Sequence, residues 1–499
     1  MATTAEEVLQ LATLLSEKIT ARRPEVQEAN RYFRGQEGRM RFASDEFREY
    51  FAKRFVGFSD NWCMPVAQAP VERIAYLGMR LPDARELAPA EESAPLPQRG
   101  AWGADPDLAR TWERNDAQRG LNEALLMMTI AKRSFAMVGT SPDGARITFE
   151  NPDSAAVTYD GATGKRRAGL VVWEDDTKEY AELLLPDGVV PLERAKVAAD
   201  RGDRRVPPEL SGWNFSATRE FRPHKLGAVP LVEFRNQSLL DNDPISDIGL
   251  VMPMQDSINL VWAYLLNALD YASLPGRVIL NGEMPKEDIL DKETGEKIGE
   301  RPMELDSLIR DRVAWLTGGN SGQPVSIAEW KPATLDGFSK VIEQAVAHIA
   351  AQTRTPSHYL IASSSANVPA AGYELAEAGL VSKASERISY ADAAVREVNR
   401  LSALAEGDTA RADRIAVGKV LWKKPQFRSE AQLMDGLQKM RGVGFPMRWI
   451  AEEYGLSPAE VDRVMDMIRE ENTDPTLERM GRDVAALTTG RGDAAFAEE

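Results

Sequence analysis

Residues 335–372 read LDGFSKVIEQAVAHIAAQTRTPSHYLIASSSANVPAAG, and this stretch decides how the rest of the chain can be organised. Its first part, Leu335–Gln352, carries apolar residues at helical spacing and predicts a helix. Its second part, Thr355–Gly372, is small and polar, and seventeen of its eighteen residues are uncharged, the remaining one being His358. The sequence therefore predicts a helix that runs into a loop almost free of charge.

A long helix is predicted after this loop, because a single apolar stripe continues at three- and four-residue steps. The stripe consists of Leu380, Ala384, Ile388, Ala391, Val395, Val398 and Leu401. At about 1.5 Å per residue, such a helix spans on the order of 40 Å.

A further helix is predicted over residues 244–272, where apolar residues again recur at helical spacing and Pro253 either kinks the helix or sets its start. Beyond Asp256 its only charge is Asp270, so it is apolar on nearly all sides. A helix of this kind needs protein cover on most faces. Neighbouring copies of the same chain could supply that cover.

The remaining segments predict an α+β fold that is mainly α-helical, with a small β-rich part. Short apolar runs alternate with turn clusters through residues 135–240, which is typical of strands and hairpins. Helices are expected over residues 1–80, with a break at Tyr32–Gly35, and an exposed loop over 82–108 follows them. Further along the chain we expect a helix over Asp107–Thr129 and a strand at Arg277–Leu280. A helical lobe is expected over 429–469, broken at Gly442–Pro446 and Gly455–Pro458.

The composition of the 499 residues restricts the possible partners. A net charge of −16 argues against a protein that grips nucleic acid electrostatically, since such proteins gather Lys and Arg on one face. Cys63 is the only cysteine, so neither a disulfide framework nor a Cys-based zinc site is expected. Residues 1–19 predict an amphipathic helix and not a signal peptide. The most apolar stretch, Ser257–Leu269, is shorter than the ~20 residues of a membrane span, so we expect a soluble, cytosolic chain.

The sequence shows no coherent catalytic, metal or cofactor site. The three histidines, His224, His348 and His358, lack metal-ligand spacing, and neither G-x-S-x-G nor H-E-x-x-H occurs. The glycine-rich stretch Thr317–Gly322 lacks the lysine of a phosphate-binding loop. Three aspartates at 241, 243 and 247 lack the glycine and glutamate that complete a calcium loop. We therefore expect a chain that is not an enzyme and holds no cofactor.

A series of short motifs runs in order along most of the chain, from Asn30 to Val461. These are Tyr32-x-x-Gly35, Val71-Glu-Arg-Ile74, Trp112-x-x-Asn115, Ala136-Met-Val-Gly139, Tyr159-Asp160, Gly227-x-x-Pro-Leu-Val232, Asn236, Ser246-Asp-Ile248, Gln255-Asp-x-Ile-Asn259, Pro356, Tyr359-Leu360, Glu377, Leu380, Lys383, Trp422, Gly444, Pro446, Gly455-Leu-Ser457 and Glu460-Val461. In this order and spacing the chain resembles the portal proteins of tailed bacteriophages, of the siphophage type. The start of the late helix, Gly372-Tyr-Glu-Leu375, departs from the usual pattern.

The resemblance implies a portal architecture of wing, stem, clip and crown. The implied division is a wing over 1–243, a stem helix over 244–274, a clip over 275–334, a second stem helix over 335–354, a tunnel loop over 355–372, a long wing helix and return over 373–428, a crown over 429–470 and a polar tail over 471–499. It also implies a closed ring, expected to be a dodecamer, that forms a channel at one capsid vertex through which DNA is packaged and ejected. Closing such a ring requires head-to-tail contacts between copies.

Two groups of residues follow from the resemblance as candidate sites. The tunnel loop is expected to face DNA with Ser357, His358, Ser363, Ser364, Ser365 and Asn367. The stem is expected to contact neighbouring copies with Ile258, Val261, Trp262, Leu265 and Leu269. A loop without lysines suits sliding DNA, because every neutralised phosphate tightens binding.

The implied partners are other copies of the chain, double-stranded DNA, the terminase packaging motor, the major capsid and scaffolding proteins and a head-completion or tail connector protein, with no membrane. The implied location is the virion, at the portal vertex, and the host cytoplasm during assembly. Two alternatives remain open at this point: another head–tail connector or capsid protein, and an enzyme with an unrecognised site.

Overall fold

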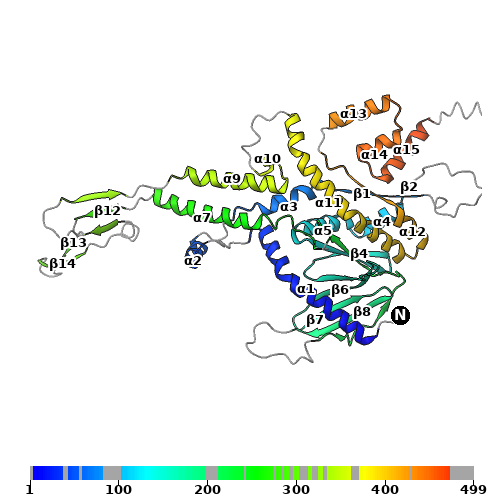
Figure 1. Cartoon of the computed structure of the whole chain (residues 1–499), viewed down its shortest axis with the longest axis horizontal. Helices are drawn as coiled ribbons and strands as arrows, with labels where there is room; N and C mark the ends of the chain where they lie inside the picture. Colours follow the sequence, from blue (N-terminus) through cyan, green and yellow to red (C-terminus); the bar gives the residue numbers. More distant parts are fainter. Residues whose placement is uncertain are drawn as a thin grey trace, which may run out of the picture.

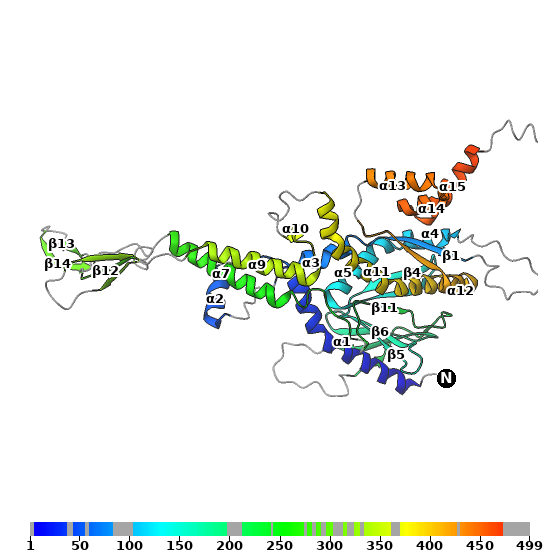
Figure 2. The same ribbon diagram turned by 45° about the horizontal axis from the view of Figure 1, so that its top comes forward.

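A computed structural model gives the fold of the chain (Figure 1). It describes residues 4–36, 43–54, 59–82, 103–196, 212–240, 243–273, 277–281, 286–290, 296–302, 313–316, 324–329, 334–360, 370–426 and 430–472. A body of helices and small sheets lies at one side, and two antiparallel helices project from it and carry strands at their far end (Figures 1 and 2). The predicted α+β fold, mainly helical, is confirmed.

Three antiparallel sheets build the body. The first has the order β11-β3-β4, with β3 at Arg133–Ser141, β4 at Gly144–Glu150 and β11 at Leu231–Arg235. The second has the order β10-β8-β7-β6-β5, with β9 paired to β8; its strands are β5 Ala155–Tyr159, β6 Arg166–Glu174, β7 Lys178–Leu184, β8 Gly188–Ala195, β9 Asn214–Phe215 and β10 Arg222–Pro223. The third joins β17 Lys419–Trp422, β1 Tyr76–Leu81 and β2 Gly103–Ala104 in that order.

Helices cover these sheets and bury their apolar stripes. Helix α1, Ala5–Phe33, begins with a capping box at Thr4 and packs its buried face on the second sheet. Helix α11, Ala370–Ala405, lies against the first sheet, and its predicted stripe is buried except for Ile388, which is partly buried. The other body helices are α3 Cys63–Val71, α4 Pro106–Arg114, α5 Ala117–Ala131 and α12 Thr409–Val417. Helix α2, Asp45–Arg54, lies outside the body beside one of the projecting helices (Figures 1 and 2).

The projecting pair consists of α7, Met252–Ser273, and α9, Asp336–Thr353, and we call it the shaft (Figure 2). Its two helices share an apolar contact through Ile258, Ile342 and Val346. The strands at its far end, which we call the tip, are β12 Arg277–Leu280, β13 Lys286–Leu290, β14 Lys297–Pro302, β15 Val313–Leu316 and β16 Ser326–Glu329. They form a sheet β15-β12-β16 and a separate pair β13-β14.

The C-terminal lobe contains α13 Glu430–Gly442, α14 Met447–Tyr454 and α15 Pro458–Asn472. Its helices end where the sequence predicted breaks. Gly444 and Gly455 have φ of 97° and 103°, in the left-handed region that glycine enters without a Cβ clash.

The predicted element bounds differ from the structure at several places. The exposed loop expected over 82–108 ends in strand β2 and the first residues of α4. The loop expected over 355–372 contains helix α10, Ser357–Leu360, and the first residues of α11. The helix expected over 244–272 begins at Met252, so Pro253 sets its start and does not kink it, as one of the two alternatives had it. Residues 243–251 form turns and a bridge between Ser238 and Pro244. Residues 76–81 are strand β1 and not helix, since pairing with β17 outweighs local propensity. The helix expected over 107–129 is two helices, divided where Asp116 adopts φ of 47°.

Candidate functional site

The shaft joins the body through a buried ion cluster. Asp247 lies 3.1 Å from the ammonium of Lys383 and 2.7 Å from the guanidinium of Arg387, and all three side chains are at most 4% exposed. Asn236 donates a hydrogen bond of 2.8 Å to the Asp247 carboxylate. Burial raises the pKa of Asp247, but the charges of Lys383 and Arg387 outweigh burial and hold that pKa below its ordinary value. The cluster therefore ties the segment before α7 to α11 by charges that water cannot screen.

A second network lies at the first turns of α7. Tyr32 donates its hydroxyl to the Asp256 carboxylate at 2.7 Å, and Trp262 donates its indole N–H to Asp60 at 2.8 Å. Gln255 accepts a bond from the Trp62 backbone at 2.7 Å and donates to the Asn259 side chain at 3.1 Å. Tyr32, Gln255, Asp256 and Asn259 are buried and hydrogen-bonded, and Asp60 and Trp262 are half-buried, so the network fixes the base of the shaft to α1 and α3 instead of destabilising it.

A third set of contacts surrounds Glu377 on α11. Its carboxylate lies 3.1 Å from the Arg73 guanidinium and 3.6 Å from the His358 ring. Arg73 also donates to the Tyr359 hydroxyl at 2.6 Å, and to the Pro425 carbonyl at 3.2 Å. Helix α10, Ser357–Leu360, is thereby attached to both α3 and α11. We call these three networks together the junction.

The ionisable groups of the junction are engaged in contacts that join its elements. Within the described residues its carboxylates are paired with cations, with a hydroxyl or, at Asp60, with indole N–H groups, so none is placed as a free general base. Burial raises the pKa of the Cys63 thiol to about 12, which removes the thiolate that a nucleophile requires. Across the described ranges no group of three or more His, Cys, Asp or Glu side chains could hold a metal ion. Of the predicted aspartate trio, Asp247 is occupied by Lys383 and Arg387, and Asp241 lies outside the described residues.

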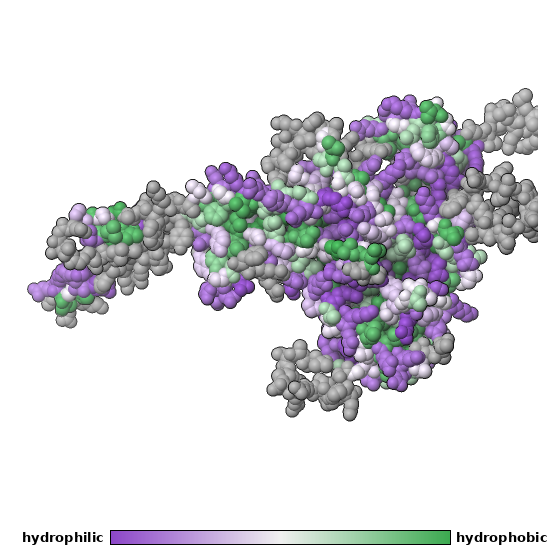
Figure 3. All heavy atoms as spheres, in the orientation of Figure 1, coloured by the Kyte–Doolittle hydropathy of each residue, from purple (hydrophilic) through white to green (hydrophobic). Residues whose placement is uncertain are grey.

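The predicted stem contacts have different surroundings. Ile258 and Leu265 are buried within the chain, while Val261 and Trp262 are half-buried against the shaft core. Leu269 is 39% exposed and faces outward. Tyr264 and Val341 are also exposed and were not predicted, and the Tyr264 ring lies 5.1 Å from that of Phe47 on α2. Figure 3 shows apolar surface on the shaft.

The predicted loop residues divide into two groups. Ser357 is exposed and His358 half-buried on α10, which holds them next to α11. Ser363, Ser364, Ser365 and Asn367 lie outside the described residues. The stretch Thr317–Gly322 does so as well.

The tip exposes large apolar side chains. Ile298 is 66% and Ile327 is 70% exposed, and Ile289, Leu290 and Val325 are exposed too. Apolar surface appears at this end of the molecule in Figure 3. Ion pairs such as Lys297 with Asp288 at 2.6 Å connect β13 and β14 across the pair. A two-stranded pair with little apolar burial, such as β13-β14, is marginal in water by itself.

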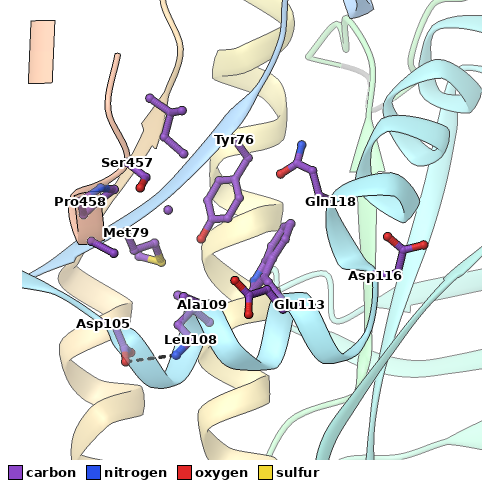
Figure 4. A pocket seen from close by; sticks show the side chains of 14 residues that line it. Tyr76, Met79, Asp105, Leu108, Ala109, Glu113, Asp116, Gln118, Ser457 and Pro458 are labelled. Atoms are coloured by element: carbon purple, nitrogen blue, oxygen red, sulfur yellow. Dashed lines mark hydrogen bonds between the residues drawn. The ribbon is translucent and has the colours of Figure 1, made fainter. Parts of the chain in front are cut away.

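A separate hollow lies where the C-terminal lobe meets the body (Figure 4). Its volume is about 350 Å³, and its walls are mostly apolar, including Tyr76, Met79, Trp112 and Pro458. Asp105 lies at its rim and accepts the Leu108 backbone N–H at 3.2 Å, which caps α4. A Cβ at Gly78 would lie 3.3 Å from Pro458, so strand β1 and α15 approach closely here.

The motifs of the junction are visible in the sequence, but the contacts that they make are not. Ser246-Asp-Ile248, Gln255-Asp-x-Ile-Asn259 and the Glu377, Leu380, Lys383 series were interpreted as positional markers, and the structure brings all three to the base of the shaft. Arg387 was missed. The signal that could have found it is its place beside Lys383 on the face that buries Leu380, Ala384 and Ala391, where a charged residue needs a partner.

A sequence model of the family described as "Phage portal protein, SPP1 Gp6-like" matches residues 102–473. A portal protein of Mycobacterium phage D29 is 26% identical over 322 residues, which cover 60% of this chain and 63% of that protein. The match therefore spans less than two thirds of the D29 protein's length. A portal protein of Mycobacterium phage L5 is 24% identical over 396 residues, which cover 75% of this chain and 70% of that protein.

Among solved structures, a chain from the neck of a native GTA particle, computed with C12 symmetry, is similar over 85% of this chain and 96% of its own. The sequence identity there is 12% and the TM-score is 0.39. Within the described ranges, no helix has both the length and the apolar character needed to cross a membrane.

Proposed function

This chain belongs to the SPP1 Gp6-like family of phage portal proteins, and on that premise we propose that it forms the ring-shaped channel at one vertex of a phage capsid. The ring contains twelve copies, and double-stranded DNA passes through it during packaging and ejection. The chain takes part as a structural component of the virion and catalyses no reaction itself.

The observation that carries the proposal is the shaft together with its tip. Two antiparallel helices project from the body, are fixed at their base by buried charges, and carry strands with exposed apolar residues. Tyr264 and Leu269 remain exposed on the shaft. Copies placed side by side around a ring cover such residues by head-to-tail contact, which is the geometry that closes a ring.

In the proposed ring, each region of the chain has a separate role. Residues 1–243 and 373–428 form the wing, α7 and α9 the stem, 275–334 the clip and 429–470 the crown. Ile258, Val261, Trp262, Leu265 and Leu269 hold the stem in the ring, the first four by fixing its helices to each other and to the body, and Leu269 by direct contact with the next copy. The clip receives the packaging motor and later a tail connector, while capsid and scaffolding proteins contact the body.

The tunnel loop over 355–372 projects toward DNA. Helix α10 near its start is attached at Glu377 through His358 and Arg73, so the loop starts from a fixed base. An uncharged loop lets DNA slide because it neutralises no phosphate. Deleting Ser363–Val368 is therefore expected to leave ring assembly intact and to impair DNA packaging; unchanged packaging would remove the role assigned to the loop.

The main test is the assembly state of the purified chain. Electron microscopy of the protein is expected to show rings with a central hole, and mass measurement is expected to give twelve copies. The substitution Leu269→Asp should reduce the yield of rings while the unassembled chain keeps its thermal midpoint. A chain that stays monomeric under every assembly condition contradicts the proposal.

A further inference from the structure

A basic cleft lies between the second sheet and α11. It measures about 630 Å³ and is lined by Lys165 and Arg166 at the start of β6 and by Arg400 on α11. Its walls also include Val229, Val232, Ala393 and Ala394, which provide apolar surface. The cleft thus combines positive charge with an apolar floor.

The carboxylates of the cleft are already engaged. Glu397 pairs with Arg166 and with Arg400, the latter at 2.7 Å. Glu233 is 3% exposed and lies 2.8 Å from both Arg133 and Arg235. Each carboxylate is therefore shared between two arginines.

The side chain of Lys165 is exposed and has no ion pair within the described residues. In a chain whose net charge is −16, this cleft is a local surplus of positive charge.

An acidic turn lies at the opposite end of the same strand. Glu174 at the end of β6 and Asp175 and Asp176 after it are all exposed, and Glu174 lies 3.1 Å from Lys196. Asp175 accepts the backbone N–H groups of Thr177 and Lys178, each at 2.7 Å, and so fixes the shape of the turn. The Asp176 side chain has no ion pair among the described residues. The turn therefore presents a free carboxylate from a rigid frame.

An aromatic pair stands beside this turn. Trp173 is 41% exposed and stacks on Tyr180 with ring centroids 6.1 Å apart. The guanidinium of Arg219 lies 5.0 Å from each ring centroid. An exposed, pre-positioned tryptophan is the side chain most often found at the energetic centre of a protein interface.

We propose that the acidic turn Glu174–Thr177 of one copy enters the basic cleft of the next copy in the ring. The proposal rests on the ring function inferred above and adds the contact that joins neighbouring wings. A ring needs two different complementary surfaces on each copy, and these two lie at the two ends of β6. Eight steps of ~3.3 Å separate Arg166 from Glu174 by about 26 Å, so the turn cannot reach the cleft of its own chain.

Zero-length carbodiimide cross-linking of assembled rings tests the contact. A covalent amide between Lys165 and Asp176 or Glu174 is expected in wild-type rings, because condensation of the ammonium with the activated carboxylate requires the two groups to touch. The bond can form only between copies. Asp176→Asn should lower the yield of the Lys165–Asp176 product to background. Asp466→Asn, on the surface of α15, serves as the matched control and should leave it unchanged.

Charge-reversal variants provide a second test of the proposed contact. Lys165→Asp and Asp176→Lys are each expected to reduce ring yield at least several-fold, since each places like charges in contact, whereas the double variant restores the attraction and the yield. Both positions are exposed, so the thermal midpoints of the unassembled variants should match the wild type.

The outcomes separate this contact from the ring itself. Rings that form without a Lys165 cross-link, or with Lys165 joined to another acidic segment, overturn the proposed contact and leave the ring function standing. A chain that forms no rings overturns both.

Discussion

The body around α11 and the tip of the shaft are stabilised in opposite ways. The body buries apolar side chains such as Leu401, Val398 and Trp112, and its buried charges pair with one another in the Asp247 cluster. The tip leaves Ile298 and Ile327 exposed and pairs its charges at the surface. The body therefore buries its own apolar and charged groups, whereas the described strands of the tip leave large apolar side chains exposed. Stability of the unassembled chain and assembly should respond to different substitutions.

The largest loss of unfolding free energy is expected from Asp247→Asn. The substitution removes the carboxylate that both buried cations share and leaves Arg387 only Glu386, at 3.6 Å, and breaking a buried pair in this way costs about 3–5 kcal/mol of unfolding free energy. Thermal or denaturant unfolding of the unassembled chain measures it. Asp288→Asn in the tip is the matched control and should leave the midpoint near the wild type, because its pair with Lys297 is exposed. If both substitutions lower the unfolding midpoint equally, the body and the tip are not stabilised in different ways.

A second contrast compares apolar side chains. Leu401 is fully buried, so Leu401→Ala should lower the unfolding free energy of the unassembled chain by about 2–5 kcal/mol. Ile327→Ala should change it by less than about 0.5 kcal/mol, since that side chain is already in water. The same Ile327→Ala chain should show weaker ring assembly or weaker binding of a tip partner. If Ile327→Ala destabilises the unassembled chain as much as Leu401→Ala, the tip has its own core.

Whether a feature could be predicted from the sequence depended on how far apart its interacting residues lie along the chain. The stripe from Leu380 to Leu401 and the breaks at Gly444 and Gly455 were visible, because periodicity and left-handed glycines are local properties. Strand β1 was not visible, since its pairing partner β17 lies more than three hundred residues away. The partners of Asp247 on α11 could not be found for the same reason. Contacts between distant segments leave only weak marks in a single sequence, such as a charge on a buried stripe.

The pH dependence of the body distinguishes a charge cluster from simple packing. Lys383 and Arg387 hold the pKa of Asp247 below its ordinary value despite burial, so the native state binds fewer protons than the unfolded state near that value. The stability from Asp247 is then fully present above the ordinary aspartate pKa of ~3.9 and is lost as pH falls through the lower folded value. The gap in midpoint between wild type and Asp247→Asn should stay constant from about pH 8 to 5 and narrow below about pH 4. A gap that does not change with pH would assign the effect to packing.

The smallest effect is expected from Lys297→Ala in the tip. Lys297 lies 2.6 Å from Asp288 and 2.7 Å from Glu300, yet all three side chains are about half exposed. Because water and salt screen such pairs, amide hydrogen exchange over 286–302 in the unassembled chain should rise by less than about tenfold at low ionic strength, and by less still at high salt. In assembled rings the same amides should exchange far more slowly, with or without Lys297, because neighbouring copies then protect β13 and β14. If loss of Lys297 alone releases these strands in the ring, surface charge and not contact between copies holds the tip.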